Sequence, residues 1–387
     1  MNPTYHPLLE YIREVNVRNS DLKVTNLLGV SVTKEFMPSI ANTIGTDMST
    51  YKIVEKGQFV YIADTSRRGD KIAIALLSDY DNAIVSQAYT IFEIIDHEAL
   101  LPEYLMMWFR RPEFDRYARF HSHGSAREVF DWDELCDVKL PVPPIARQRE
   151  LVAEYETLTR RIRLNEQMIA KLEETAQALY RKMFVEGIDK EKLPEGWRMG
   201  RLGEYCTIIT KGTTPDSFSE TGLVNYVKAE SITSSHNLDE SRFSYISEYI
   251  HKNELKRSIL QKDDILFTIA GTLGKFCKVP SKILPANTNQ AVAIIRVNPD
   301  LISCFAIYGM FIGGFHVEYC KRNIQQAVQA NYSLETIHSI PILIPDDATL
   351  SVYTKQMETI ITNIDCKFIE NEKLKELLSL LLAKMGK

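Results

Sequence analysis

Residues that could perform nucleotide chemistry occur in this chain, but their spacing does not fit a known phosphate site. The run Gly271–Lys275 reads Gly-Thr-Leu-Gly-Lys, which resembles part of a phosphate-binding loop. Such a loop needs a second glycine five residues before its Gly-Lys pair and a Ser or Thr after it. Here Ile269 holds the first place and Phe276 the last. We therefore expect no ATP site at this run.

Titratable residues give equally weak indications of catalysis. Asp263 and Asp264 could hold a metal, but adjacent acidic residues before an apolar run are more typical of a turn. His121 and His123 have no cysteine or third histidine nearby to complete a metal site. The chain also has neither a GxGxxG dinucleotide motif nor a GxSxG nucleophile turn. The sequence therefore favours a non-catalytic chain with no cofactor or metal of its own.

The chain as a whole is organised as a tandem repeat, so each structural element would occur twice. The segment 151–185 reappears 202 residues later as 353–387. In both, apolar residues recur at spacings of four and three, which is the seam of a coiled coil. At about 1.5 Å per residue, each helix would span roughly 50 Å. The predicted seam includes Leu158, Ile162, Asn165, Ile169 and Leu172 in the first copy, and Ile360, Ile364, Asn371 and Leu374 in the second.

Polar residues interrupt both seams near their middle. Asn165 interrupts the first seam, and Lys367 and Asn371 interrupt the second. A buried polar residue weakens a coiled coil but fixes the register of its helices.

The stretches before the helices also repeat, with less fidelity. Segment 56–61 resembles 262–267, and 86–92 resembles 289–295. Segment 135–143 aligns with 337–345, and both alternate apolar and polar residues before a proline, as half-buried strands do. The sequence therefore predicts a globular domain at 1–150, a helix at 151–187, a second domain at 188–350 and a second helix at 351–387.

Composition is that of a soluble globular protein, with 45% hydrophobic and 25% charged residues. No apolar run approaches the roughly 20 residues of a membrane span, and no signal peptide is evident. The six cysteines are widely spaced, which favours reduced thiols and a cytoplasmic protein. The net charge of −5 argues against nucleic-acid binding. Basic clusters at 66–71, 255–257 and 320–322 argue for it, because a basic face can coexist with an acidic remainder.

Four segments, taken together, resemble the DNA-specificity subunit of Type I restriction-modification enzymes. They are Leu193-Pro-Glu-Gly-Trp197, Ile209-Thr-Lys-Gly-Thr-Thr-Pro215, Asp264-Ile-Leu-Phe267 with Gly271–Lys275, and Ile340-Pro-Ile-Leu-Ile-Pro345 before the second helix. The resemblance covers nearly the whole chain. In the first half, Arg67-Arg68-Gly69 stands where the second half has its Gly-Thr-Leu-Gly-Lys run.

The resemblance implies an α+β fold with two pseudo-symmetric target-recognition domains joined by two long antiparallel coiled-coil helices. Each domain would read one half of a bipartite target in double-stranded DNA, and the helices would set the gap. The chain would itself be non-catalytic and would dock two modification (methyltransferase) subunits, which bind S-adenosylmethionine and methylate adenine. Restriction subunits that use ATP and Mg would join that core.

Base reading needs polar or basic side chains on exposed loops, and phosphate contacts need Lys, Arg or loop N–H groups. On that basis we predict DNA contacts from the first domain at Thr33, Lys34, Ser66, Arg67, Arg68 and Arg127. From the second domain we predict Lys211, Thr213, Thr214, Lys275, Gln326, Gln329, Asn331 and Tyr332. Gln87 and Gln290 occupy matching places, where a structural role at a strand end is the simpler interpretation.

Two alternatives remain open from the sequence. One is a non-catalytic coiled-coil adaptor whose domains bind protein partners, which the acidic net charge favours slightly. The other is a self-sufficient nuclease or methyltransferase, for which the chain offers no convincing carboxylate pair.

Overall fold

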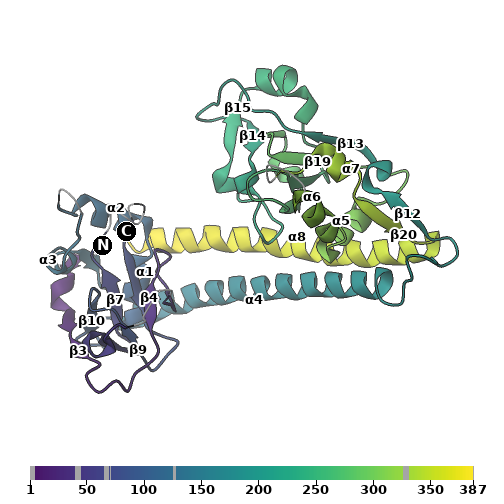
Figure 1. The fold of residues 1–387 in the computed structure, drawn as a ribbon. Coiled ribbons are helices and arrows are strands. Elements are labelled where there is room, and N and C mark those ends of the chain that lie inside the picture. Colours follow the sequence, from purple (N-terminus) through teal and green to yellow (C-terminus); the bar gives the residue numbers. More distant parts are fainter. Residues whose placement is uncertain are drawn as a thin grey trace. The chain divides into compact units, whose positions relative to one another are not determined.

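The computed structural model describes residues 5–39, 45–64, 69, 71–124, 128–325 and 331–386. The chain forms two compact units, and each unit contains both helices and strands. Unit 1 comprises Met1–Asn165 and Ile369–Lys387, and unit 2 comprises Glu166–Phe368. The long helices α4 (Ile145–Phe184) and α8 (Asp347–Lys384) each contribute one half to either unit (Figure 1).

Unit 1 is built around an antiparallel four-stranded sheet in the order β2-β10-β7-β8. These strands are β2 (Ile12–Val15), β10 (Thr90–Ile94), β7 (Phe59–Ile62) and β8 (Ala73–Leu76). A second sheet contains β3 (Val17–Arg18), β6 (Lys52–Glu55) and β9 (Asn82–Val85). Two further pairs are β4 (Leu28–Val30) with β5 (Phe36–Pro38), and β1 (Tyr5–Pro7) with β11 (Lys139–Pro141). The helices are α1 (Pro102–Phe109), α2 (Pro112–Phe120) and α3 (Trp132–Cys136), with short 3-10 turns at Leu8–Glu10 and Met48–Thr50.

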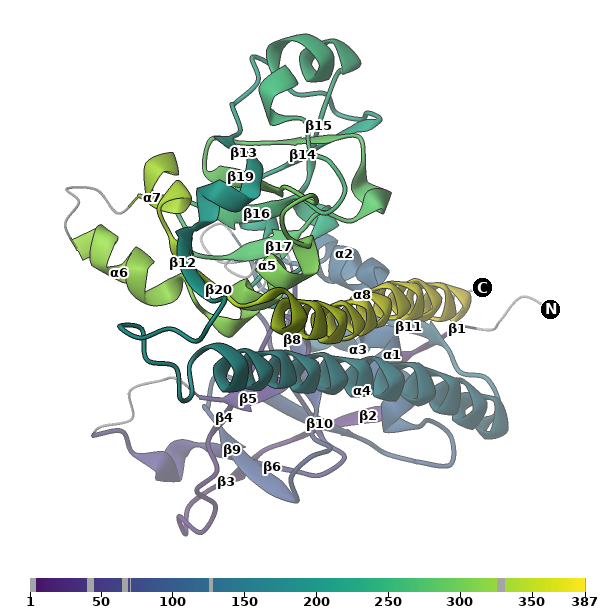
Figure 2. The same cartoon turned by 90° about the vertical axis from the view of Figure 1, so that its right-hand side faces the viewer.

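Unit 2 repeats this plan with an antiparallel sheet in the order β13-β19-β16-β17 (Figure 2). These strands are β13 (Cys206–Lys211), β19 (Val292–Val297), β16 (Ile265–Thr268) and β17 (Phe276–Lys278). The second sheet contains β15 (Ser244–Ile246), β14 (Val224–Val227) and β18 (Ala286–Thr288), and β12 (Arg198–Arg201) pairs with β20 (Pro341–Ile344). The helices are α5 (Cys304–Gly313), α6 (Val317–Gln325) and α7 (Leu334–His338). Short helical turns lie at Leu202–Tyr205, Ala229–Ser231, Glu240–Arg242, Ile250–Glu254, Lys256–Ser258 and Ser281–Ile283.

The side chains of the central strands alternate between the two faces of the sheet, which explains why each unit has a core layer on either side of it. Successive side chains of a strand point to opposite faces of the sheet. In β16, Ile265 and Phe267 pack toward the helices, whereas Leu266 packs toward the three-stranded sheet. In unit 1, Phe59 and Tyr61 of β7 pack toward the helices in the same way. The central sheet of each unit is therefore buried on both faces.

The long helices begin earlier than the heptad pattern alone indicates. Helix α4 begins at Ile145 rather than 151, directly after Pro144, whose carbonyl accepts the amides of Arg147 and Gln148. Helix α8 begins at Asp347 rather than 351, because the Asp346 carboxylate accepts the amide of Thr349 at 3.0 Å. Such a cap satisfies an N–H group that the first helical turn leaves free.

Within each unit the two helix segments run antiparallel. In unit 1, Leu151 near the start of α4 joins the same core as Leu381 and Met385 near the end of α8. In unit 2, Phe184 at the end of α4 meets Tyr353 near the start of α8, with ring centroids 4.7 Å apart. The expected α+β fold with paired antiparallel helices is confirmed within each unit.

The smaller sheets show where the two copies have diverged. In unit 1, β6 pairs with β9 over four residues, and a single parallel bridge joins Leu27 to Ile84. In unit 2, β18 holds the place of β9. It pairs in parallel with β14 over three residues, and its antiparallel contact is a single bridge between Asn287 and Ile259. The repeat is therefore strict in the central sheet and loose around it.

Candidate nucleic-acid interface

Four segments of unit 2 meet at one end of its central sheet. Strand β16 ends at Thr268, opposite Val292, where β19 begins. Lys211, the last residue of β13, lies opposite Ala293. The end of β13, the β18–β19 turn and the β16–β17 loop therefore share this edge. The loop between α6 and α7 joins them, because the amide of Tyr332 donates to the Ile269 carbonyl at 2.9 Å.

Further contacts tie these segments to one another. The Thr214 hydroxyl donates to the side-chain oxygen of Gln290 in the β18–β19 turn. The amide of Ile269, at the start of the β16–β17 loop, donates to the Ala291 carbonyl at 2.8 Å. We call this set of loops (211–214, 289–291, 269–275 and 331–332) the unit 2 interface. It brings together segments that are far apart in the sequence.

The glycines of this interface are required by backbone geometry. A Cβ on Gly212 would lie 1.8 Å from the Thr288 carbonyl oxygen, so only glycine allows the chain to pass there. Gly271 and Gly274 have φ of 74° and 81°, in the left-handed region that favours glycine. The Lys275 amide donates to the Thr268 hydroxyl at 2.9 Å, and the Gly274 amide donates to the Thr268 carbonyl at 3.0 Å. The Gly-Thr-Leu-Gly-Lys run therefore forms a strand-to-strand turn.

The predicted contact residues of unit 2 fall into three groups. Lys211, Thr213, Thr214 and Asn331 are exposed at the interface, and Lys275 is half-buried there. Tyr332 is only 8% exposed, and its ring packs against Phe267 in the core. Gln326 and Gln329 lie outside the described residues.

Unit 1 has the corresponding arrangement at the end of its central sheet. The amide of Phe130, in the α2–α3 loop, donates to the Ala63 carbonyl at 2.9 Å, as Tyr332 does to Ile269. Val129 also forms isolated antiparallel β-bridges with Asp64 and with His123. We call the described residues of the β7–β8 loop (63–64, 69 and 71–72) and of the α2–α3 loop (121–124 and 128–131), together with the β4–β5 hairpin, the unit 1 interface. The predicted Ser66, Arg67, Arg68 and Arg127 belong to these loops but lie outside the described residues.

The β4–β5 hairpin places Thr33 and Lys34 very differently. Thr33 is exposed, and its hydroxyl lies 2.7 Å from that of Ser31. Lys34 is 5% exposed, and its ammonium donates to the Asp115 carboxylate at 2.6 Å and the Ile72 carbonyl at 3.3 Å. Burial lowers the pKa of Lys34 and the Asp115 contact opposes that effect. The Lys34 ammonium thus fixes the hairpin to α2 and β8.

Sequence reasoning missed one exposed residue at the unit 1 interface. Phe120, the last residue of α2, is 83% exposed. The prediction considered polar and basic residues only, so an aromatic residue was passed over. A phenylalanine between Arg119 and the two histidines was the available signal.

The remaining titratable clusters have structural partners. The Asp264 carboxylate is 1% exposed, accepts two hydrogen bonds from Arg296 at 2.7 Å, and accepts the Gln261 amide. His121 and His123 both contact Glu134, at 3.2 and 3.1 Å. Among the residues that the structure describes, no three His, Cys, Asp or Glu side chains gather as a metal site.

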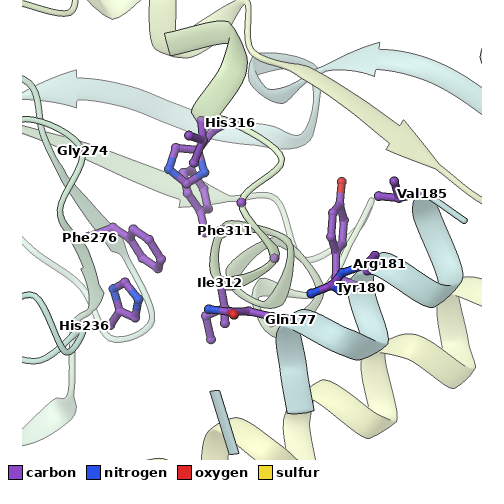
Figure 3. A pocket seen from close by; sticks show the side chains of 13 residues that line it. Gln177, Tyr180, Arg181, Val185, His236, Gly274, Phe276, Phe311, Ile312 and His316 are labelled. Atoms are coloured by element: carbon purple, nitrogen blue, oxygen red, sulfur yellow. The ribbon is translucent and has the colours of Figure 1, made fainter. Parts of the chain in front are cut away.

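A hollow of about 630 Å³ lies in unit 2 between the end of α4, the α5–α6 turn and the β16–β17 loop. Figure 3 shows His236 beside Phe276, and His316 beside Phe311, around this hollow. The Nδ1 atoms of both histidines are buried and have no hydrogen-bond partner in the described structure. Burial, together with the nearby His236, lowers the pKa of His316 from its ordinary 6.5 to about 4. At neutral pH both rings are uncharged, as aromatic core residues would be.

The predicted helix seam lies on the packed faces of α4 and α8. Ile162, Asn165, Ile169, Ile364 and Asn371 are buried, whereas Leu158, Leu172, Ile360 and Leu374 are half-buried. Beside the seam of unit 1, a groove of about 760 Å³ is lined by Leu158 of α4 and by Leu377, Leu380 and Leu381 of α8. Leu377 and Leu380 are 50% and 60% exposed. This groove is an apolar surface on otherwise charged helices.

No helix in the described part of the chain combines the length and the apolar composition that crossing a membrane requires.

Known proteins resemble this chain in sequence. Residues 194–380 match the model of the Type I restriction modification DNA specificity domain. The specificity subunit of the type I restriction enzyme HindI from Haemophilus influenzae is 21% identical, with 86% of each chain covered. A Methanocaldococcus jannaschii protein described as the MjaX specificity subunit is also 21% identical, over 72% of this chain and 66% of that protein.

The fold has a solved counterpart as well. The S subunit of a Type I restriction-modification system from M. genitalium superposes with a TM-score of 0.58, at 14% identity, over 100% of this chain and 99% of that one. Residues 194–380 thus match a Type I restriction modification DNA specificity domain, and the chain as a whole is similar to Type I restriction-modification specificity subunits.

Proposed function

We propose that unit 1 and unit 2 each read one half of a bipartite DNA target, through the interfaces defined above. The observation that carries this proposal is the matching position of those interfaces. In unit 1, the loop after β7 is hydrogen-bonded to the loop between α2 and α3. In unit 2, the loop after β16 is hydrogen-bonded in the same way to the loop between α6 and α7. An interface that repeats while its side chains differ suits two readers of two different half-sites.

The side chains available there suit a DNA groove. Lys211 supplies a cation for phosphates, and Thr213, Thr214 and Asn331 supply groups that hydrogen-bond base edges. We leave Lys34 and Tyr332 out of the direct contacts, because the Lys34 ammonium is engaged by Asp115 and the Tyr332 ring is buried. Their role in the proposal is to hold the loops in place.

Partner subunits would dock on the paired helices, and the chemistry would belong to them. The groove beside Leu377 and Leu380 is an apolar surface of the kind that protein partners cover. In this proposal two modification subunits bring S-adenosylmethionine and methylate adenine, and restriction subunits bring ATP and Mg. The specificity chain carries neither cofactor, and its activity would be exerted in the cytoplasm on double-stranded DNA.

The test is to express the chain with and without its modification subunits and to sequence the methylome of the host. We expect methylation at one bipartite site only when both proteins are present. Lys211→Ala with Asn331→Ala should then relax or abolish recognition of one half-site and leave the other intact. Normal methylation of that site by the modification subunits alone would contradict the proposal.

The adaptor alternative makes the opposite prediction for DNA. An assembled complex that binds protein partners but shows no salt-dependent affinity for duplex DNA would support the adaptor. Electrophoretic mobility at several salt concentrations distinguishes the two functions.

A further inference from the structure

Phe120 is the most exposed of the large apolar residues in the described part of unit 1. A single exposed apolar side chain needs no special explanation on a protein surface. Phe120, however, is 83% exposed and ends α2 at the unit 1 interface. We propose that Phe120 is a specificity-determining residue that contacts a thymine methyl group in the major groove of the half-site read by unit 1. This inference rests on the proposed function.

The structure fixes the end of α2 to the loops of the interface. Arg119 forms an ion pair with Glu128, on the far side of the α2–α3 loop. Two backbone hydrogen bonds between His123 and Val129, of 3.0 and 2.9 Å, close that loop at its base. Val129 in turn bridges Asp64 of the β7–β8 loop. The end of α2 that carries Phe120 is therefore tied to the base of the α2–α3 loop and, through Val129, to Asp64 after β7.

The helix face that carries Phe120 points away from the core. The buried residues of α2 are Phe114 and Ala118. On the other side, the Tyr117 ring stacks on His121 at 4.2 Å, and Phe120 meets the edge of His121 at 5.2 Å. These contacts limit the orientations of the Phe120 ring without covering it. A pre-oriented apolar side chain loses little conformational entropy when it binds.

Thymine offers an apolar group that matches this side chain. Its C5-methyl is an apolar feature of the major-groove edge, and phenylalanine is one of the side chains that contacts it. Arg116, one turn earlier on the same helix, is exposed and forms an ion pair with Glu113 at 3.3 Å. An exposed aromatic ring at this place can thus approach the major groove and distinguish thymine from cytosine.

The repeat indicates that this position is one where the two units differ. Ala118 and Cys320 are both buried, as are Phe114 and His316, so the offset of 202 holds along α2 and α6. The same offset places Arg322 where unit 1 has Phe120. An aromatic ring in one unit and a guanidinium in the other would favour different bases.

The test replaces the thymines of the target by deoxyuridine, which lacks only the methyl group. The full chain is assembled with its modification subunits, and the probe is a duplex carrying the bipartite site found by methylome sequencing. Replacing one particular thymine should weaken binding of the unaltered complex about tenfold, as losing one base-specific contact does. The Phe120→Ala complex should bind the thymine and deoxyuridine duplexes equally, about as weakly as the unaltered complex binds the deoxyuridine duplex.

Ile95→Ala provides a matched control. Ile95 is 52% exposed and follows β10 at the end of the sheet opposite the interface, so its loss should leave the thymine effect intact. The inference is overturned if the Phe120→Ala complex keeps the full thymine preference, or if neither half-site contains a sensitive thymine. A complex that methylates no bipartite site at all would instead refute the proposed function.

Discussion

The side-chain amide of Asn165 donates a hydrogen bond of 2.8 Å to the Oδ1 of Asn371, inside the helix seam of unit 1. Both residues are buried, at 0% and 5% exposure, and the Asn165 Oδ1 has no partner in the described structure. A buried polar group that loses its partner costs about 1–3 kcal/mol, whereas replacing both members by apolar groups can be neutral or stabilising. The pair should therefore respond very differently to single and double substitution.

We expect Asn165→Leu alone to lower the free energy of unfolding by about 1–3 kcal/mol, because it strands Asn371. The double variant Asn165→Leu with Asn371→Leu should recover that loss or exceed the original stability. Urea unfolding of Asn165→Leu, of Asn371→Leu and of the double variant measures the non-additivity. Gln167→Leu, at an exposed helix position, serves as the control and should change little. Simple additivity of the two single effects would show that the amides are not coupled.

His316 should make unit 2 sensitive to mild acid. Its pKa is about 4 in the folded state and 6.5 in the unfolded chain, so the unfolded chain binds more protons between these values. The stability is therefore complete above pH 6.5, falls as pH is lowered toward 4, and changes no further below that. A shift of this size corresponds to about 3 kcal/mol.

His316→Phe should remove most of that dependence, because phenylalanine cannot be protonated and Phe114 fills the equivalent place in unit 1. Scanning calorimetry between pH 7.5 and 4 provides the measurement. The exposed His97→Phe variant should keep the original pH profile. An unchanged profile in His316→Phe would assign the acid sensitivity elsewhere.

Gly212→Ala should disturb the unit 2 interface through the backbone alone. The added Cβ would meet the Thr288 carbonyl oxygen at 1.8 Å, so β13 must move away from β18. Forcing atoms into a packed site typically costs about 1–3 kcal/mol. We expect lower stability of unit 2 and loss of one half-site in the methylome. Thr213→Ala, at the exposed neighbouring position, should leave stability within about 0.5 kcal/mol.

Lys211→Ala should reduce the salt dependence of DNA binding by the assembled complex. Each neutralised phosphate contributes about one unit to the slope of log K against log salt concentration. The slope should therefore become shallower by about one, with weaker binding to all duplexes. Lys262→Ala is a suitable control, because Lys262 is exposed just before β16, at the other end of the sheet. Equal slopes in the two variants would remove Lys211 from the phosphate contacts.

Leu377→Ser with Leu380→Ser should weaken the association with modification subunits without unfolding unit 1, because both side chains are half exposed. The loss scales with the apolar area that a partner covers, at roughly 25 cal/mol per Å². Analytical ultracentrifugation of the mixed proteins would detect the change. Thr175 and Ala178 hold the repeat-equivalent places in unit 2 and are exposed. Substituting them tests whether the same face of unit 2 also contributes to the binding of modification subunits.

The sequence predicted periodic features well because they depend on local spacing. The seam residues Ile162, Ile169 and Ile364 are buried as their heptad positions require. Ile361 is 1% exposed although it lies outside the seam, because α8 also packs against the globular core of unit 2. A second packing partner widens the apolar stripe of a helix beyond its coiled-coil positions.

Long-range contacts were the part that spacing could not indicate. Nothing near Lys34 in the sequence shows that Asp115 will accept its ammonium, since 81 residues separate them. In the same way, Tyr332 and Ile269 meet through a backbone hydrogen bond that no side-chain pattern encodes. The sequence could name loops by their composition, but only the fold shows which loops share an edge and which side chains remain exposed there.

The division of both long helices between the units has a consequence for synthesis. Unit 2 is continuous in the chain, whereas unit 1 needs Ile369–Lys387 as well as its first 165 residues. The Tyr5 hydroxyl donates to the Gly386 carbonyl at 3.0 Å, so unit 1 contains a contact between residues 381 positions apart. A ribosome must therefore synthesise all of unit 2 before it makes the C-terminal half of α8, which completes unit 1. A chain that stops early would carry a finished second reader beside an unfinished first one, whose apolar helix face stays open to chaperones and proteases.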